Sequence, residues 1–204
     1  QAAISGFGSL TSDEIDQGMR QALAELRRFG TILTAEVSNT GLSLPLLTAS
    51  PLEFHYFYEC LGFDLLHDGP LPHDFPFLAQ EAVASLPVSA AAHATYSVSA
   101  PLCQRIKAWN AAQGRPTGVH LAESREEIAF LRDGNGAFRD LLIRRGRWFD
   151  DYTPPGCSPA VYLDRLGFWD ETTLAVHGVW LEAPDRELLA QRGVFRGHRH
   201  QHQH

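Results

Sequence analysis

The sequence predicts an α/β protein organised around a parallel sheet. Short apolar or β-branched runs, which are typical of strands, alternate along the chain with segments of helical periodicity. Strands that alternate with helices form parallel sheets from right-handed β-α units. Three of the strand runs also end on a histidine just before a helix. With 204 residues, 44% hydrophobic and 20% charged, the chain has the composition of a soluble globular protein with one sizeable core or two small ones.

The first third of the chain contains a predicted helix and two predicted strands. Thr11-x-x-Glu14 is a capping box that should begin a helix, and Gly30 is suited to end it. Residues 31–37 (TILTAEV) are β-branched and apolar, which predicts a buried strand. The aromatic-rich residues 53–63 (EFHYFYECLGF) predict a second strand.

The rest of the chain continues the alternation of strands and helices. The remaining predicted elements are a helix over roughly 75–86, a strand over 88–92, a helix carrying Leu102, Ile106 and Trp109, a strand over 117–122, a helical stretch over 126–147 interrupted at Gly134 and Gly136, a short helix after Ser158, a strand over 172–176 and a final helix with Pro184 in its first turn.

The most informative stretch is 117–127 (TGVHLAESREE), in which a histidine and a glutamate stand three residues apart. Side chains at i and i+3 of a strand point in opposite directions, so His120 and Glu123 converge only if the strand ends between them. Ser124-x-x-Glu127 is a capping box that should begin a helix there. An isolated pair of this kind is more often a buried histidine beside a surface glutamate, so the rest of the chain must decide.

Two further histidines occupy equivalent positions. His93, His120 and His177 each follow an apolar strand run and precede a helix. Since the carboxyl ends of parallel strands lie at one edge of the sheet, we expect the three imidazoles there, with Glu123 beside the middle one. Imidazole is the usual ligand of zinc, and a carboxylate that does not bind the metal can shuttle protons to and from a metal-bound water. The pattern favours a functional site.

Composition indicates which classes of partner and which cellular compartment to expect. The formal net charge of −7 argues against nucleic acid or an anionic membrane as the partner. No apolar run approaches the ~18 residues of a transmembrane helix, and no signal-peptide pattern opens the chain. The three cysteines, Cys60, Cys103 and Cys157, have no C-x-x-C spacing, so we expect a reducing, cytoplasmic location.

The C-terminal end differs from the rest of the sequence. Residues 195–204 include four histidines and show no apolar periodicity, so we assign them to an unstructured His-rich tail and residues 1–194 to a single domain. Neither a G-x-G-x-x-G after a strand nor a P-loop motif is present, so a nucleotide-phosphate cradle is not expected.

Four segments together resemble a known family. Residues 93–98 (HATYSV), 120–123 (HLAE) and 176–179 (VHGV) look like three successive motifs of the amidohydrolase superfamily, and residues 29–34 (FGTILT) more weakly resemble its second strand. The closest branch is that of the chlorohydrolases and the purine- or pterin-type deaminases. At position 95 this chain has threonine where the family often has proline.

The resemblance implies a (β/α)8 barrel, the TIM-barrel fold, with a divalent metal at its carboxyl rim, zinc or else iron. In that family His120 would be a metal ligand and Glu123 the proton shuttle. His177 would steer the attacking water or the leaving group, and His93 would contact the substrate. The implied reaction is attack of a metal-bound hydroxide on an sp2 carbon of a small cyclic or amidine substrate, breaking a C–N bond other than a peptide bond and releasing ammonia or another leaving group.

The sequence lacks parts of the family pattern. No H-x-H pair follows a strand and no aspartate ends an eighth strand, although both supply metal ligands in the family. Five predicted strands correspond to strands two to six of eight, so we expect a partial barrel. One imidazole cannot hold zinc, which needs about three protein ligands in a catalytic site, so this chain alone should be inactive. Open sheet edges favour association, including a homo-oligomer.

Three hypotheses remain open at this point. The chain is an incomplete metal-dependent deaminase-type hydrolase, or it is a non-catalytic binding or regulatory module that reuses the scaffold and pairs its open edges with another chain. The third hypothesis is a metal-independent hydrolase that uses Glu123 with His177.

Overall fold

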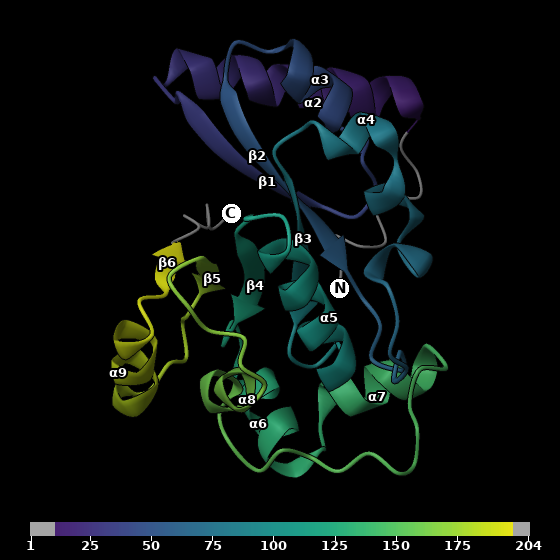
Figure 1. The fold of residues 1–204 in the computed structure, drawn as a ribbon, viewed down its shortest axis with the longest axis vertical. Coiled ribbons are helices and arrows are strands. Elements are labelled where there is room, and N and C mark those ends of the chain that lie inside the picture. The colour runs from purple at the N-terminus through teal and green to yellow at the C-terminus, as the bar shows by residue number, and fades with distance from the viewer. Residues whose placement is uncertain (1–10, 198–204) are drawn as a thin grey trace.

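The computed structural model describes residues 11–197, and its centre is one parallel sheet. Each of the six strands lies beside its successor in the sequence, in the order β1-β2-β3-β4-β5-β6 (Figure 1). The strands are β1 (Leu33–Ser38), β2 (Glu53–Cys60), β3 (Val88–Ala94), β4 (Thr117–Leu121), β5 (Thr173–His177) and β6 (Phe195–Gly197). Because all neighbours are parallel, the carboxyl ends lie along one edge. This is an open section of a (β/α) barrel wall, as the sequence predicted.

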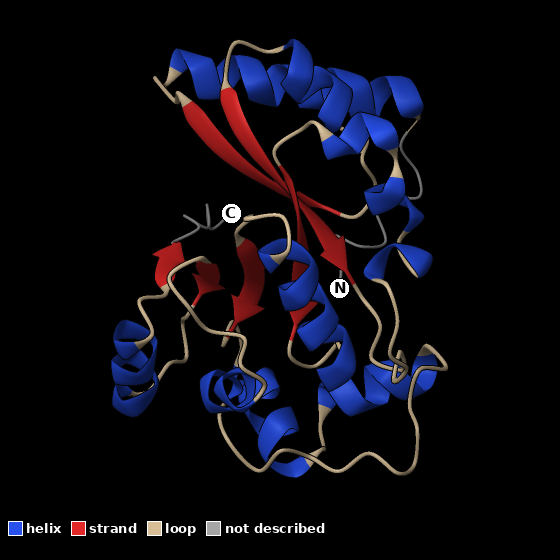
Figure 2. Ribbon diagram, viewed as in Figure 1, coloured by secondary structure: helices blue, strands red, loops and turns tan. Residues whose placement is uncertain are grey.

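Helices connect the strands and surround the sheet (Figure 2). They are α2 (Ser12–Arg28), α3 (Leu44–Ala49), α4 (Glu81–Ala84), α5 (Ala100–Ala111), α6 (Arg125–Asp133), α7 (Ala137–Arg144), α8 (Pro159–Arg165) and α9 (Ala183–Gln191), with 3-10 turns η2 (Leu71–His73) and η3 (Pro76–Ala79). Hydroxyl side chains accept a first-turn N–H at four helix starts, those of α2, α5, α6 and α8. Local chemistry therefore sets where these helices begin.

The helical stretch predicted over 126–147 is indeed two helices. Gly134 ends α6 with a φ of 69°, and Gly136 precedes α7 with a φ of 92°. Both values lie in the left-handed region that favours glycine. The two glycines therefore stop one helix and redirect the chain into the next.

The single helix predicted over 75–86 is wrong. The structure has the 3-10 turn η3 followed by the one-turn helix α4. Gln80 between them has φ −67° and ψ 132°, which is extended backbone, so no continuous helix can pass through it. The apolar spacing of this segment reflects two short turns that bury Leu78 and Val83 separately.

Strand β1 is also less buried than the sequence predicted. Its side chains alternate between exposed and half-buried, and Leu33 and Val37 are exposed. The reason is its position at the edge of the sheet, where β2 is its one strand neighbour among the residues described. Apolar composition indicated a strand but did not indicate which neighbours would cover it.

The sixth strand lies where the sequence predicted the start of the tail. Phe195–Gly197 pairs with β5 in parallel, placing Leu174 opposite Phe195. The prediction of five strands was therefore one short, because a three-residue edge strand has too few residues to show a period. The remainder of the predicted tail, residues 198–204, lies outside the described residues.

The core lies between the middle strands and their helices. Helix α5 packs on β3, and Asn110 from α5 is fully buried at this contact. The Asn110 amide accepts from the Ala90 N–H and donates to the Ala90 carbonyl and the Thr117 hydroxyl, so its polar atoms are satisfied. A second cluster packs Phe63 against Phe130 and Leu131 of α6 and Leu142 of α7. Within the described residues no helix is both long and apolar enough to cross a membrane.

Candidate active site at the carboxyl edge of the sheet

The three histidines singled out by the sequence lie side by side at the carboxyl edge. His93 is in β3, His120 is in β4 and His177 ends β5. The ring centroids are 5.7 Å apart for His93 and His120 and 5.1 Å apart for His120 and His177. The β3–β4 register is irregular between Ala92 and Ala94, a distortion that re-aims the intervening His93. Three separate β-α units thus deliver three imidazoles to one place.

The fourth predicted residue, Glu123, reaches the same place because the chain turns sharply after β4. Its Oε1 atom lies 3.5 Å from Nε2 of His177. Ala122 and His177 have φ values of 48° and 75°, and they are the two non-glycine residues in the left-handed region within residues 11–197. Such backbone strain concentrates at functional sites. Here it turns the chain out of each strand so that the two side chains can meet.

Backbone hydrogen bonds hold the two strained turns against each other. The Gly178 N–H donates to the Leu121 carbonyl at 2.8 Å, and the Trp180 N–H donates to the Ala122 carbonyl at 2.9 Å. The strand ends are therefore fixed relative to each other, and the Glu123–His177 distance depends on this pairing. The His177 side chain is 5% exposed and that of Glu123 is 44% exposed, so the carboxylate can reach solvent or a bound molecule.

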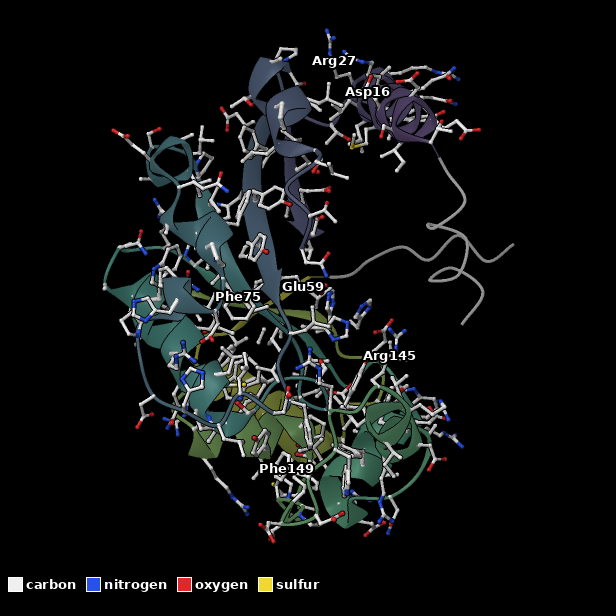
Figure 3. The ribbon with its side chains drawn as sticks, turned by 90° about the vertical axis from the view of Figure 1, so that its right-hand side faces the viewer. Asp16, Arg27, Glu59, Phe75, Arg145 and Phe149 are labelled. Atoms are coloured by element: carbon white, nitrogen blue, oxygen red, sulfur yellow. The ribbon has the colours of Figure 1, made fainter. Side chains whose placement is uncertain are left out.

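Sequence reasoning missed one residue of this group, Glu59. It stands near the end of β2, and its Oε1 atom lies 3.2 Å from Nε2 of His120. Figure 3 shows it where β2 enters the lower part of the molecule. Burial alone would raise the pKa of Glu59, but the hydrogen bond to His120 and the charges of His93 and His120 lower it overall. The sequence predicted a strand over 53–63, which placed Glu59 inside the strand, whereas β2 ends at Cys60 and brings Glu59 to its carboxyl end.

His93 has different surroundings from its neighbours. Its Nδ1 atom lies 2.6 Å from the Ser97 hydroxyl, and Tyr96 contacts its ring edge-on. Burial lowers the pKa of His93, with the nearby carboxylate of Glu59 opposing that effect. The lowered pKa favours a neutral imidazole at neutral pH, which can both donate and accept a hydrogen bond.

The predicted Ser124–Glu127 capping box is only half formed. The Ser124 hydroxyl accepts from the Glu127 N–H at 3.3 Å, as expected. The Glu127 carboxylate does not return to Ser124; it accepts from the Glu123 N–H at 3.0 Å and from the Thr95 hydroxyl at 2.7 Å. Glu127 is fully buried, and its carboxylate bonds to residues that follow β3 and β4 and not to Ser124.

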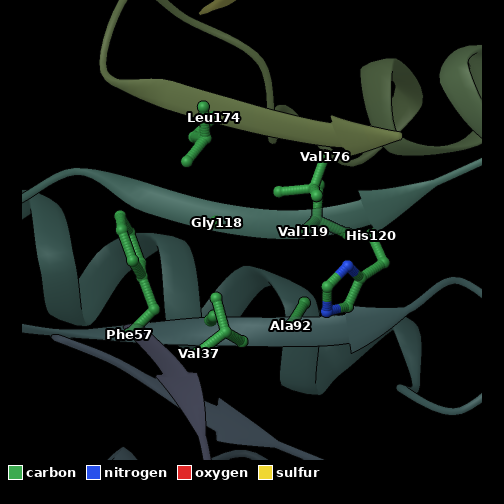
Figure 4. A pocket seen from close by; sticks show the side chains of 9 residues that line it. Val37, Phe57, Ala92, Gly118, Val119, His120, Leu174 and Val176 are labelled. Atoms are coloured by element: carbon green, nitrogen blue, oxygen red, sulfur yellow. The ribbon is translucent and has the colours of Figure 1, made fainter. Parts of the chain in front are cut away.

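The inner face of the sheet below the site is narrow and apolar. Figure 4 shows a small cavity there, with His120 at the strand end and Ala92 and Val176 beside it. Gly118 leaves room for a neighbouring ring, because a Cβ at this position would lie 3.1 Å from Cδ1 of Phe57. The wall beneath the histidines is thus packed by side chains, as in barrel interiors.

The residues described do not by themselves make a complete metal site. His120 fits the role of one ligand, since its Nδ1 atom is buried and has no hydrogen-bond partner. However, residues 11–197 contain no group of three or more histidine, cysteine or acidic side chains arranged to hold a metal ion. Catalytic zinc needs about three protein ligands, so the donor set is insufficient for zinc.

Known proteins resemble this chain over part of their length. No protein-family model matches it. A 5-methylthioadenosine/S-adenosylhomocysteine deaminase of Thermococcus onnurineus is 27% identical over 106 residues, which are 52% of this chain and 20% of that protein. The fold is similar to that of an adenosine deaminase from Xanthomonas campestris solved with bound zinc, with a TM-score of 0.69, 20% identity and coverage of 94% of this chain and 40% of that one. The resemblance to the amidohydrolase superfamily is confirmed.

A second solved structure extends this amidohydrolase resemblance. A mutant atrazine chlorohydrolase from Arthrobacter aurescens, complexed with zinc and atraton, has a TM-score of 0.67 and 16% identity and covers 97% of this chain and 45% of its own. The chain therefore spans about a fifth of the curated relative and less than half of either solved protein. Its six strands have the fold of a section of the barrels in these proteins.

Proposed function

We propose that this chain carries the proton-transfer half of a hydrolytic deaminase. The observation that supports this most is the Glu123–His177 pair, 3.5 Å apart and beside His120 at the carboxyl edge of the sheet. The same strand-to-helix turn that strains Ala122 creates the pair. The deaminases among the similar proteins support the reaction class.

Hydrolytic deamination needs two proton transfers that this pair can perform. Water adds to the sp2 carbon that bears the amino group, a C–O bond forms, and the C–N bond then breaks to release ammonia. Glu123 is exposed enough to take the proton of the attacking water and to return it to the departing amine. His177 holds the Glu123 carboxylate in place and orients the water or the leaving group, and neutral His93 contacts the substrate ring.

The substrate class follows from the relatives as part of the same proposal. The similar deaminases have names that specify adenosine-type nucleosides, so we infer a small molecule with an amino group on a purine-like ring. The zinc in both solved neighbours supports a divalent metal, zinc in preference to iron, with His120 as one ligand. The other ligands must come from outside the described residues, which supply no complete set.

The test is an ammonia-release assay on adenosine, 5′-deoxyadenosine and 5-methylthioadenosine with added zinc. It compares this chain with the same chain extended to the ends of its reading frame. We expect turnover by the extended protein, and loss of about 10³-fold or more with Glu123→Gln. Glu126→Gln, at an exposed glutamate in the first turn of α6, is the matched control and should leave turnover unchanged. An extended protein that is folded and zinc-loaded but inactive on all three substrates would contradict the proposal.

The incomplete donor set favours a second candidate, a binding module that reuses the scaffold. Exposed apolar side chains on β1, including Leu33, give such a module a surface for another chain. Light scattering distinguishes the two. A stable oligomer without turnover in the extended protein supports the module, whereas a monomer that deaminates excludes it.

A further inference from the structure

Glu127 is an unusual residue for the first turn of a helix. First-turn carboxylates ordinarily face solvent, where the helix dipole stabilises them. Glu127 is 0% exposed. Burying a carboxylate is costly unless hydrogen bonds compensate. Burial raises the pKa of Glu127, and hydrogen bonds from Thr95 and from the backbone N–H groups of Glu123 and Ala122 oppose that rise.

The donors to Glu127 belong to two different strand ends. Thr95 directly follows β3, two residues after His93. The N–H of Glu123 lies in the turn after β4, next to the strained Ala122. The two oxygens of one buried carboxylate therefore tie the β3 loop to the β4 turn, Oε1 through Thr95 and Oε2 through the Glu123 N–H.

We propose that Glu127 and Thr95 form a positioning pair that holds the Glu123 turn so that its carboxylate faces His177. This rests on the proposed function for the role of Glu123, but the positioning itself is a structural claim. The pair is buried, with Glu127 0% exposed and Thr95 3% exposed, so it is placed to position and not to bind a substrate. It acts through the backbone of Glu123, by fixing a turn whose left-handed Ala122 would otherwise relax.

Helix capping alone does not account for this geometry. The cap of α6 is Ser124, whose hydroxyl accepts from the Glu127 N–H. The Glu127 carboxylate does not bond to Ser124 itself; it bonds to Glu123, one residue before the cap, and to Thr95 after β3. Helix capping does not require the hydrogen bond from Thr95, which lies outside α6. Proline at position 95, which the resembled family often has, carries no hydroxyl, so this link depends on the threonine of the present chain.

The experiment measures the Glu123 amide in the purified chain by 15N NMR and hydrogen exchange. Thr95→Val removes the hydroxyl at nearly constant shape, and Glu127→Gln replaces an acceptor oxygen with a donor. Both should shift the Glu123 amide resonance and speed its exchange by about tenfold, as expected for one lost charge-assisted bond. Thr95→Ser restores the donor and should restore both signals. Ser124→Ala, which removes only the cap, should leave the Glu123 amide within about twofold of wild type.

A kinetic measurement distinguishes a failure of the positioning pair from a failure of the proposed deaminase function. In the extended protein, Thr95→Val should lower kcat on the active nucleoside by about tenfold with KM within about twofold, and Thr95→Ser should recover kcat. An unchanged Glu123 amide in Thr95→Val and Glu127→Gln, with both variants folded, overturns the positioning pair whatever the activity. Absence of turnover in wild type counts against the deaminase proposal alone, because the amide measurement does not depend on it.

Discussion

Strands β3 and β1 belong to the same sheet yet differ sharply in burial. Six of the seven residues of β3 are buried, whereas none of the six in β1 is. Strand β3 has β2 and β4 on its two sides and α5 packed on it, while β1 has only β2 beside it among the described residues. Helix α2, which precedes β1, buries none of its residues either.

This difference shows where the candidate site can form. A strained turn such as that at Ala122 persists only where its surroundings over-determine it, and β3, β4 and β5 supply those surroundings. The edge strand β1 offers no such support, and its apolar side chains are left for a further neighbour. The interior of the wall holds the candidate site, and its edge leaves apolar side chains exposed.

The largest expected effect comes from breaking the buried contact between α5 and β3. Asn110→Ala removes three hydrogen bonds and leaves the Ala90 N–H and C=O without their partner. We expect the free energy of unfolding to fall by about 3 kcal/mol, measured by urea titration. Asn135→Ala, at an exposed site, is the control and should change it by less than about 0.5 kcal/mol. Equal losses of unfolding free energy in Asn110→Ala and Asn135→Ala would show that the buried contact between α5 and β3 contributes no more to stability than an exposed site does.

A smaller effect on stability is expected at Tyr56 in β2, the strand that pairs with the edge strand β1. This residue is fully buried in β2, and its hydroxyl accepts from the Gly41 N–H and donates to the Ser38 carbonyl at the end of β1. Tyr56→Phe keeps the ring and removes both bonds. We expect the free energy of unfolding to fall by about 1–2 kcal/mol. Hydrogen exchange should accelerate at Gly41 but not in β4; uniform acceleration across the sheet would mean that β1 is not a separate, weaker region.

Much of this contrast could be predicted from the sequence, and part of it could not. The alternation of elements, the three histidines at one edge and the turn between His120 and Glu123 all depend on neighbours in the sequence. The exposure of β1, the strand at Phe195–Gly197 and the direction of the Glu127 carboxylate depend on what lies across the sheet. Glu59 was missed for a different reason: the strand predicted over 53–63 extends past the end of β2 at Cys60, so Glu59 did not stand at a predicted strand end.

An ion pair between Lys107 of α5 and Asp170, just before β5, should make the free energy of unfolding depend on pH. The ammonium lies 2.6 Å from Oδ1 of Asp170. Burial alone would raise the pKa of Asp170, but hydrogen bonds from Lys107 and Thr172 and the charge of Lys107 lower it from 3.8 to about 2. Because the folded-state pKa is lowered, the stabilisation is complete above the unfolded pKa and is lost as pH falls through the folded one.

The Asp170 side chain is 40% exposed, so solvent screening limits this contribution to about 1 kcal/mol or less. Lys107→Met should lower the free energy of unfolding by that amount at neutral pH. The difference from wild type should shrink between about pH 4 and pH 2, as measured by urea titration at each pH. A difference that stays constant over this range would assign the effect of Lys107 to packing and not to charge.

The smallest effect on stability, and the most direct test of the edge, is expected from Val37→Lys in β1. Val37 is 37% exposed, so a lysine there can extend into solvent and should change the free energy of unfolding by less than about 0.5 kcal/mol. Lysine on an edge strand opposes pairing with another strand. If wild type associates through β1, light scattering should show a lower mass for Val37→Lys, whereas Val179→Lys, at an exposed site after β5, should leave the mass unchanged. If Val37→Lys associates as strongly as wild type, the contact between chains does not involve β1, and the exposure of β1 has no role in assembly.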